Sequence, residues 1–227
     1  MSHYADNKDL FPMQGGCACG HIRYQLEMAP IMVHCCHCTA CQKHTGSAFA
    51  LSAYIESSAI TLLSAAAPTI AGSPGGPASV SCGLMPGFRD ITGGVPQPEN
   101  PSSKPALHTV PSGSGIGVTI AQCPVCHVGL WSHYADVGNF VSYLRCGTLD
   151  QPWHVEPDAH IYLKSRRSFV TLSDGKPQFD EYYPDKSAMY RPDVKDRVAK
   201  ISERQAQFRE ELMAIIAQGS KAATDGA

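Results

Sequence analysis

Seven of the ten cysteines in this chain fall into three short clusters whose spacing suits metal binding. In chain order they are Cys17 and Cys19, then Cys36, Cys38 and Cys41, then Cys123 and Cys126. Cysteines one to three positions apart on a tight turn can direct their thiolates at one point, which suits a tetrahedral zinc ion with Zn–S bonds near 2.3 Å. Glycines and prolines beside the clusters favour such turns. The spacing therefore indicates metal sites.

Seven thiols divide naturally into four and three. Four thiolates make a closed, structural site, whereas three leave one coordination position open, as a catalytic zinc requires. The separated pairs Cys17/Cys19 and Cys123/Cys126 could form the closed site, and the run 36–41 could supply three ligands from one loop. Spacing alone leaves alternatives open. All seven could hold the fold together around one or two closed zinc sites, ligate an iron–sulfur cluster, or form disulfides.

Histidines around the middle cluster could orient a ligand or carry a proton. His37 lies inside the cluster, and His34 and His44 flank it, although a solvated or packed histidine is the commoner case. His160 could face the site from a strand. Cys35 is interpreted as a bystander beside the site.

Two cysteines lie outside the clusters. Cys146 is interpreted as a buried strand cysteine. Cys82 lies in a stretch rich in proline, glycine and serine and receives no role.

Short strands separated by turns are expected to position these clusters. In residues 21–28, Ile22, Tyr24 and Leu26 alternate with polar neighbours, which is strand spacing. Further strand-like runs occupy residues 48–55, 116–123, 129–134, 139–146, 159–164 and 168–172. Many short strands with turns between them predict a mainly β domain.

The chain divides into a domain, an insertion and a tail. Residues 1–185 are expected to form the domain, and an insertion or long loop is expected at about 65–110. Residues 186–227 are expected to form a C-terminal helix and tail. Its apolar residues follow three- and four-residue steps, with the polar Gln205 filling the one gap: Val194, Val198, Ile201, Phe208, Leu212 and Ile215. This amphipathic helix could pack on its own domain or make a homodimer contact.

Composition excludes several functions. The chain has 227 residues and a formal net charge of −2, and no segment is densely basic, which argues against nucleic acid or an anionic membrane as partner. The first residues lack an apolar signal core, and no apolar run approaches a membrane span. An intracellular, cytoplasmic location is expected, where thiols stay reduced and disulfides are rare.

The cysteine clusters and their flanks resemble a known family. The segments GGCACGHIRYQL, CHCTACQKHTGSAF, CPVCHVGLWSHY and GTLDQPWHVEPDAHIYLKSR are similar to the glutathione-dependent formaldehyde-activating enzymes, a family that also includes centromere protein V. The resemblance covers about residues 14–183, apart from much of 65–110. It implies a β-tent fold, built from antiparallel sheets organised around zinc.

The resemblance also implies ligands and a reaction. A structural zinc would be bound by Cys17, Cys19, Cys123 and Cys126, and a second, active-site zinc by Cys36, Cys38 and Cys41. The family's named activity joins glutathione and formaldehyde, formally a carbon–sulfur lyase run in reverse. We expect two zinc ions per chain, with glutathione or another thiol as cosubstrate and a small carbonyl as its partner. Cationic partners for glutathione carboxylates could be Lys43, Arg166 and Arg167.

The chain departs from the family's pattern at several points: His127 replaces a usual glycine, Gln42 a frequent arginine and Phe169 a common tryptophan. Cys35 is an extra thiol, and the insertion is long for the family. None removes an expected zinc ligand. The expected function is a zinc-dependent carbon–sulfur lyase-like enzyme. The alternatives are an enzyme of the same fold acting on a larger metabolite or its thiol conjugate, and a non-catalytic, zinc-stabilised protein-interaction module.

Overall fold

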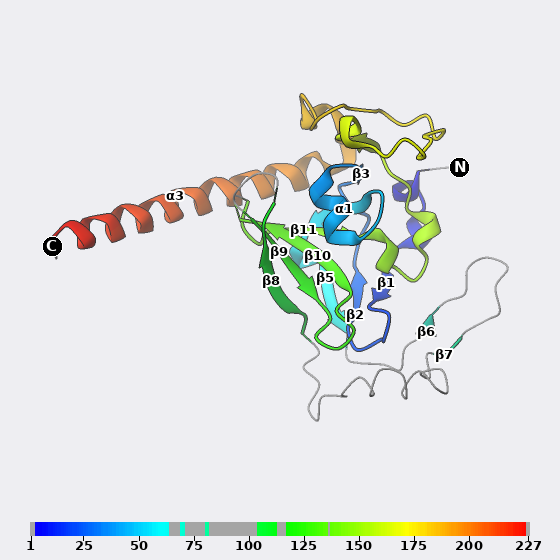
Figure 1. The fold of residues 1–227 in the computed structure, drawn as a ribbon, viewed down its shortest axis with the longest axis horizontal. Helices are drawn as coiled ribbons and strands as arrows, with labels where there is room; N and C mark the ends of the chain where they lie inside the picture. Colours follow the sequence, from blue (N-terminus) through cyan, green and yellow to red (C-terminus); the bar gives the residue numbers. More distant parts are fainter. Residues whose placement is uncertain are drawn as a thin grey trace.

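The computed structural model describes residues 3–63, 69–70, 80–81, 104–112, 117–135 and 137–225. These residues form a mainly β body from which one long helix extends (Figure 1). The expectation of a mainly β fold with a C-terminal helix is confirmed. Most of the expected insertion, including Cys82, lies outside the described residues.

The largest sheet has seven strands, in the spatial order β12-β3-β4-β11-β10-β9-β8. The strands are β3 (Met32–Cys36), β4 (Ala50–Glu56), β8 (Ala106–Val110), β9 (Val118–Gln122), β10 (Gly129–Tyr134), β11 (Val141–Arg145) and β12 (Ala159–Ile161). Neighbouring strands are antiparallel except β12 and β3, which run parallel and place His160 opposite Cys35. The sheet is therefore mixed, and the expectation of purely antiparallel sheets is wrong at this edge.

A second sheet carries the N-terminal hairpin. It has three antiparallel strands in the order β1 (Met13–Gly16), β2 (Arg23–Leu26) and β5 (Ile60–Leu63). A Cβ atom at Gly15 would lie 2.7 Å from the backbone oxygen of Thr148, so only glycine lets these segments approach so closely. A separate two-stranded sheet pairs β6 (Thr69–Ile70) with β7 (Val80–Ser81).

Two α-helices and eight short 3-10 helices complete the described chain. Helix α1 (Thr39–Thr45) ends at Gly46, whose φ of +63° is the left-handed conformation that glycine adopts at helix ends. Helix α3 (Lys195–Asp225) follows the last 3-10 helix. The 3-10 helices are η1 (Tyr4–Asp6), η2 (Lys8–Leu10), η3 (Ser57–Ala59), η4 (Cys146–Thr148), η5 (Pro152–His154), η6 (Leu163–Ser165), η7 (Lys186–Met189) and η8 (Pro192–Val194).

Two groups of buried apolar side chains form the core. The first packs the N-terminal hairpin against the large sheet and includes Tyr24, Leu26, Val33, Ile55 and Leu144. Burying each such side chain stabilises the fold by about 1.5–3 kcal/mol. The second group joins the large sheet to the start of α3 and includes Met32, Tyr54, Val141, Val194 and Ile201.

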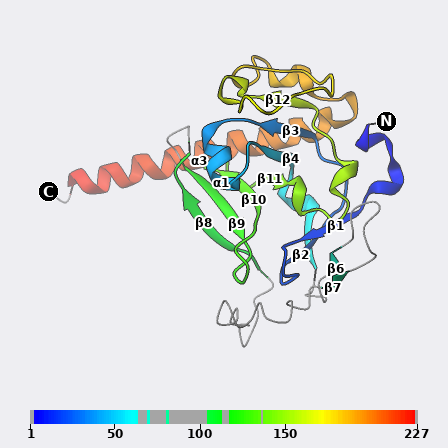
Figure 2. The same ribbon diagram turned by 45° about the vertical axis from the view of Figure 1, so that its right-hand side comes forward.

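The first half of α3 packs on its own domain, which was one of the two expected roles of this helix. Val194 and Ile201 are buried, Val198 packs beside them, and the Phe208 ring meets the Phe140 ring edge-on. The C-terminal part of α3 projects away from the body (Figures 1 and 2). A dimer contact through this helix stays a prediction.

The strand expected at residues 168–172 is wrong. The structure has turn and irregular backbone there, and the Phe169 side chain is 73% exposed, so the apolar letters do not line a core. Conversely, β3 was not expected as a strand. All five of its residues are buried, because neighbours cover both faces, and such a strand shows no apolar–polar alternation.

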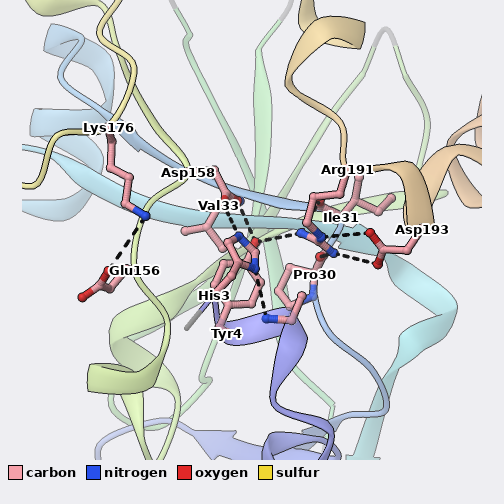
Figure 3. A network of polar contacts seen from close by, with 11 residues as sticks. His3, Tyr4, Pro30, Ile31, Val33, Glu156, Asp158, Lys176, Arg191 and Asp193 are labelled. Carbon is pink, nitrogen blue, oxygen red and sulfur yellow. Dashed lines mark hydrogen bonds and ion pairs between the residues drawn. The ribbon is translucent and has the colours of Figure 1, made fainter. Parts of the chain in front are cut away.

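A network of polar contacts fixes the N-terminal segment to β3 (Figure 3). The Asp158 carboxylate accepts hydrogen bonds from the Tyr4 hydroxyl at 2.6 Å and the Val33 amide at 2.7 Å, and it pairs with His3. Arg191 donates to the carbonyl oxygens of Pro30 and Ile31. These bonds hold the end of β3 that lies away from the cysteine cluster, which helps to fix the position of the strand that carries it.

Candidate metal centres

The structure brings Cys17, Cys19, Cys123 and Cys126 together from segments about a hundred residues apart. Their sulfur atoms all lie within 4.8 Å of one another. Cys17 follows β1, while Cys123 follows β9 and precedes the turn into β10. The Ile22 amide donates to the Cys17 sulfur at 3.2 Å, a turn contact typical of cysteine ligands.

The spacing of these sulfurs fits a tetrahedral ion. Sulfurs bonded at 2.3 Å to a tetrahedral zinc lie about 3.8 Å apart. The Cys17–Cys19 and Cys19–Cys123 sulfur distances are 3.5 and 3.7 Å. A hydrogen bond from the Cys17 thiol is the main cause that lowers the pKa of Cys126 to about 4. The thiolate is the form of cysteine that binds a metal ion.

Cys36, Cys38 and Cys41 form a second group whose sulfurs also lie within 4.8 Å of one another. Cys36 ends β3, Cys38 is the N-cap of α1, and Cys41 lies in the first turn of that helix. The sulfur of Cys38 accepts the Cys41 amide at 3.3 Å. The expected single loop is thus a strand end followed by a helix start.

Cys38 is the strongest thiolate candidate of the second group. Hydrogen bonds from the thiols of Cys36 and Cys41, helped by backbone amides at the start of α1, hold the pKa of Cys38 far below its usual range. In the described part of the chain, no further Cys, His, Asp or Glu joins these three ligand atoms. A metal ion held by the three thiols would keep one coordination position for another ligand.

A third group was not expected. Cys35, His37 and His160 place one ligand atom each within 4.8 Å of the others, and all three residues are buried. Cys35 therefore does not stand alone beside the three-thiol group, as the sequence suggested. His160 lies on a strand as expected, but it meets Cys35 and His37 rather than the three thiols. The sequence could have indicated this pair, because side chains two residues apart in extended backbone lie on the same face. Cys35 lies in β3, and His37 follows directly after it.

The other expected site residues are dispersed. Lys43, Arg166 and Arg167 are exposed, and Arg166 donates to the carbonyl oxygen of Val170. The His44 ring lies 3.1 Å from the Pro111 oxygen. Burial is the main cause that lowers the pKa of His34 to about 3, so this ring is neutral.

Gln42 and Cys146 have structural positions. The Gln42 amide donates to the carbonyl oxygens of His37 and Ser165, at 2.8 and 2.9 Å, and so joins α1 to the segment after β12. Cys146 is buried, as expected, at the start of η4.

Tyrosines surround the three-thiol group, and sequence reasoning missed them. Burial, followed by the nearby charges of Cys41, Cys36 and Cys38, raises the pKa of Tyr134. Burial and the same thiols raise the pKa of Tyr162. Tyr162 also has a φ of 59°, an uncommon backbone conformation for a bulky residue, and such residues cluster at functional sites.

One cavity lies away from the cysteine groups. It has a volume of about 460 Å³ and is lined by residues that include His3, Tyr4, Trp153 and Lys176. None of its lining residues belongs to a cysteine group. Its charged rim includes a Lys176–Glu156 pair at 4.0 Å (Figure 3). We assign it no role in the chemistry of the thiols.

The fold and the sites together define a mainly β protein with buried Cys and His groups whose geometry can hold metal ions. The family model described as glutathione-dependent formaldehyde-activating enzyme matches residues 12–79. The resemblance to this family is therefore confirmed over that part of the chain. The matched segment contains Cys17, Cys19, Cys36, Cys38 and Cys41, whereas Cys123 and Cys126 lie beyond it.

Comparisons with other proteins add little. No curated protein matches this chain. The crystal structure of a Rhodobacter sphaeroides protein, a structural-genomics target, is 14% identical and covers 74% of this chain and 99% of its own, with a TM-score of 0.34. At that TM-score the likeness carries no argument. Within the described residues, no helix has both the length and the apolar character to cross a membrane.

Proposed function

We propose that this protein is a zinc-dependent, carbon–sulfur lyase-like enzyme that forms or cleaves the adduct of a thiol and a small carbonyl such as formaldehyde. The thiol is glutathione or a similar molecule. The observation that carries the proposal is the three-thiol group of Cys36, Cys38 and Cys41, which the described residues leave one ligand short of a tetrahedron. The family match over residues 12–79 supports the same reaction class.

The proposal gives the two cysteine groups different tasks. Cys17, Cys19, Cys123 and Cys126 hold a structural zinc, and Cys36, Cys38 and Cys41 hold the catalytic zinc. Residues 1–185 then form the zinc-binding domain, a β-tent, and residues 186–227 its helix and tail. The sulfur distances of 3.5 and 3.7 Å in the four-thiol group support the structural site.

The reaction balances without a further reactant. In the forward direction the sulfur of the thiol forms a bond to the carbonyl carbon, and the π electrons of the carbonyl pass to its oxygen. That oxygen takes up the proton that the thiol gives up, and the reverse reaction breaks the C–S bond. A zinc ion bound by three thiolates would accept the substrate sulfur as fourth ligand and favour its thiolate, the nucleophilic form.

The chain's own residues prepare this site. Backbone amides at the start of α1 and the neighbouring thiols stabilise negative charge on Cys38, so this ligand is ready to bind a cation. Tyr162 packs beside the apolar group that contains Cys36 and Cys41. Three thiolate ligands make the site electron-rich, which favours delivery of a thiol over activation of water.

Two cysteine substitutions test the proposal. Cys38→Ser should lose one zinc per chain and abolish exchange between formaldehyde and its glutathione adduct, measured by magnetisation transfer with ¹³C-labelled formaldehyde. Its far-UV circular dichroism should match the unchanged protein. Cys123→Ser should unfold the domain, because it opens the closed site. Cys146→Ser, which alters a buried cysteine outside both groups, is the matched control.

The outcomes test the catalytic role of the three-thiol group and its separation from the structural site. Full exchange activity in Cys38→Ser would overturn the catalytic role of the three-thiol group. If the unchanged protein binds both zinc ions but has no activity with any small carbonyl, a larger thiol conjugate becomes the substrate to test. If Cys38→Ser unfolds as completely as Cys123→Ser, the division into a structural and a catalytic site is wrong.

A further inference from the structure

Cys35, His37 and His160 converge on one point beside the edge of the large sheet. β12 lies beside β3 (Figure 2) and runs parallel to it. The register of the two strands places His160 directly opposite Cys35. Successive side chains of a strand point to opposite faces, so Cys35 and His37 share a face that Cys36 does not. Nε2 of His37 lies 3.5 Å from the Cys35 sulfur and 3.2 Å from Nδ1 of His160.

These distances are those of ligands around a tetrahedral ion. With Zn–S near 2.3 Å and Zn–N near 2.05 Å, tetrahedral angles place sulfur and nitrogen about 3.6 Å apart and two nitrogens about 3.3 Å apart. The observed separations agree with both values to about 0.1 Å. The exposed fractions of Cys35, His37 and His160 are only 3%, 0% and 3%, so water does not compete freely for their ligand atoms.

A carboxylate orients the outer histidine. Nε2 of His160 lies 2.7 Å from the Asp174 carboxylate, which is itself fixed by the Lys176 amide at 3.2 Å. A proton on Nε2 leaves the Nδ1 lone pair facing Cys35 and His37. This is the arrangement in which a metal-binding histidine donates its other ring N–H to a carboxylate.

The inner histidine is fixed through its backbone. The His37 amide donates to the Ile161 carbonyl at 3.0 Å, and its carbonyl accepts from the Gln42 side chain at 2.8 Å. Nδ1 of the His37 ring is buried and has no hydrogen-bond partner. The backbone bonds therefore position this residue, and Nε2 is the ring atom directed at the group. A metal ion bound at Nε2 would leave the ring proton on Nδ1.

We propose that Cys35, His37 and His160 bind a third metal ion, a divalent transition metal of the zinc type. One thiolate and two imidazoles are donors of intermediate softness, which suits zinc and disfavours magnesium or calcium. The site shares no ligand with either cysteine group and is independent of the proposed enzyme activity. It would clamp the three-residue strand β12 to β3.

Zinc bound to imidazole nitrogen would identify the proposed third site, because the two cysteine groups offer only sulfur. X-ray absorption of the zinc-loaded protein should show nitrogen near 2.0–2.1 Å in addition to sulfur near 2.3 Å. His160→Gln and Cys35→Ala should each lose one zinc per chain and, with it, the nitrogen scattering. Asp174→Asn, which alters a partly exposed residue outside the ligand set, should keep the fold and weaken this zinc about 10- to 100-fold.

Matched control variants show whether the zinc is lost from the group of Cys35, His37 and His160. Cys146→Ala, a buried cysteine in no group, should keep all zinc, and Cys38→Ser should lose a sulfur-bound zinc while keeping the nitrogen signal. Failure of the enzyme assay therefore does not touch this proposal. An unchanged protein without zinc-bound nitrogen, or an Asp174→Asn protein with unaltered zinc affinity, would overturn it and leave a hydrogen-bonded chain from Asp174 to Cys35.

Discussion

Single residues at the ends of elements carry much of the site. Cys38 is both a member of the three-thiol group and the N-cap of α1, because its sulfur accepts the Cys41 amide at 3.3 Å. The same N–H groups that begin the helix therefore also stabilise charge on a proposed metal ligand. His127 shows the opposite case, a residue whose side chain does not suit its backbone.

Replacing His127 by glycine should stabilise the protein. His127 has a φ of 59°, a left-handed conformation that costs a side-chain-bearing residue about 1–2 kcal/mol. It is exposed, so the loss of its ring removes little packing. We expect a gain of about 1 kcal/mol, because the added freedom of the unfolded chain offsets part of the relief. Chemical denaturation of the zinc-loaded protein measures this change in the free energy of unfolding.

The matched control for this prediction is His154→Gly, an exposed histidine in η5 that lacks a positive φ. Glycine should destabilise the protein there. Equal effects at the two positions would show that the strain at His127 is negligible.

At the scale of elements, β3 and its neighbours decide which side chains meet. β3 delivers Cys36 to one group and Cys35 to another because its successive side chains alternate between faces. Helix α3 is fixed by its first half, where Arg197 forms two bonds of 2.8 and 2.6 Å to the Glu56 carboxylate of β4. Arg197 also donates to the Ala29 carbonyl at 2.9 Å, so one guanidinium joins the helix to two segments of the body.

The Glu56–Arg197 pair should stabilise the protein with a defined pH dependence. Burial tends to raise the pKa of Glu56, but the bonds from Arg197 outweigh it, and the net pKa lies below the ordinary value. A carboxylate with a lowered folded-state pKa contributes fully above its unfolded pKa of about 4.3, and the contribution is lost as pH falls through the lower, folded value.

Glu56→Gln tests this dependence. We expect a loss of about 1–3 kcal/mol that is constant from pH 8 to pH 5 and shrinks only below about pH 4.3. Glu210→Gln, which changes an exposed residue of α3, should leave stability unchanged. The free energies of unfolding of the unchanged protein and of Glu56→Gln should differ by the same amount at pH 7 and pH 5. If this difference already shrinks between pH 7 and pH 5, the pKa of Glu56 is not lowered.

At the scale of the whole molecule, the four-thiol group joins parts of the chain that are distant in sequence. The four-thiol group links the loop after β1 to the turn between β9 and β10, and these loops belong to different sheets. An ion bound there would close a long loop and so restrict the unfolded chain. In the proposed function the three-thiol group lies within residues 36–41 and adds little such restraint.

The zinc ions of the two cysteine groups should therefore be removed in two stages. A weak chelator should first take the zinc of the three-thiol group, with loss of activity but little change in melting temperature. A strong chelator should then remove the zinc of the four-thiol group and unfold the domain. Calorimetry with parallel zinc analysis measures both stages. Unfolding that accompanies loss of the first zinc would contradict the separation of roles.

Local sequence determined the features that depend on near neighbours. Alternation in residues 21–28 predicted β2, the three- and four-residue steps after Val194 predicted α3, and the cysteine spacing marked which thiols could act together. Each depends on backbone geometry over a few residues, which the letters express directly. The strand predicted at residues 168–172 was wrong because an apolar run forms a strand only where a partner strand pairs with it and a core covers it.

Only the tertiary structure decided what distant segments do to one another. The parallel pairing of β12 with β3 sets His160 opposite Cys35, and no local pattern encodes the partner or direction of a strand. The sequence could show that Cys35 and His37 lie two residues apart. It could not show that a histidine and a carboxylate, more than a hundred residues further on, complete their surroundings, because that depends on how buried surfaces pack across the whole chain.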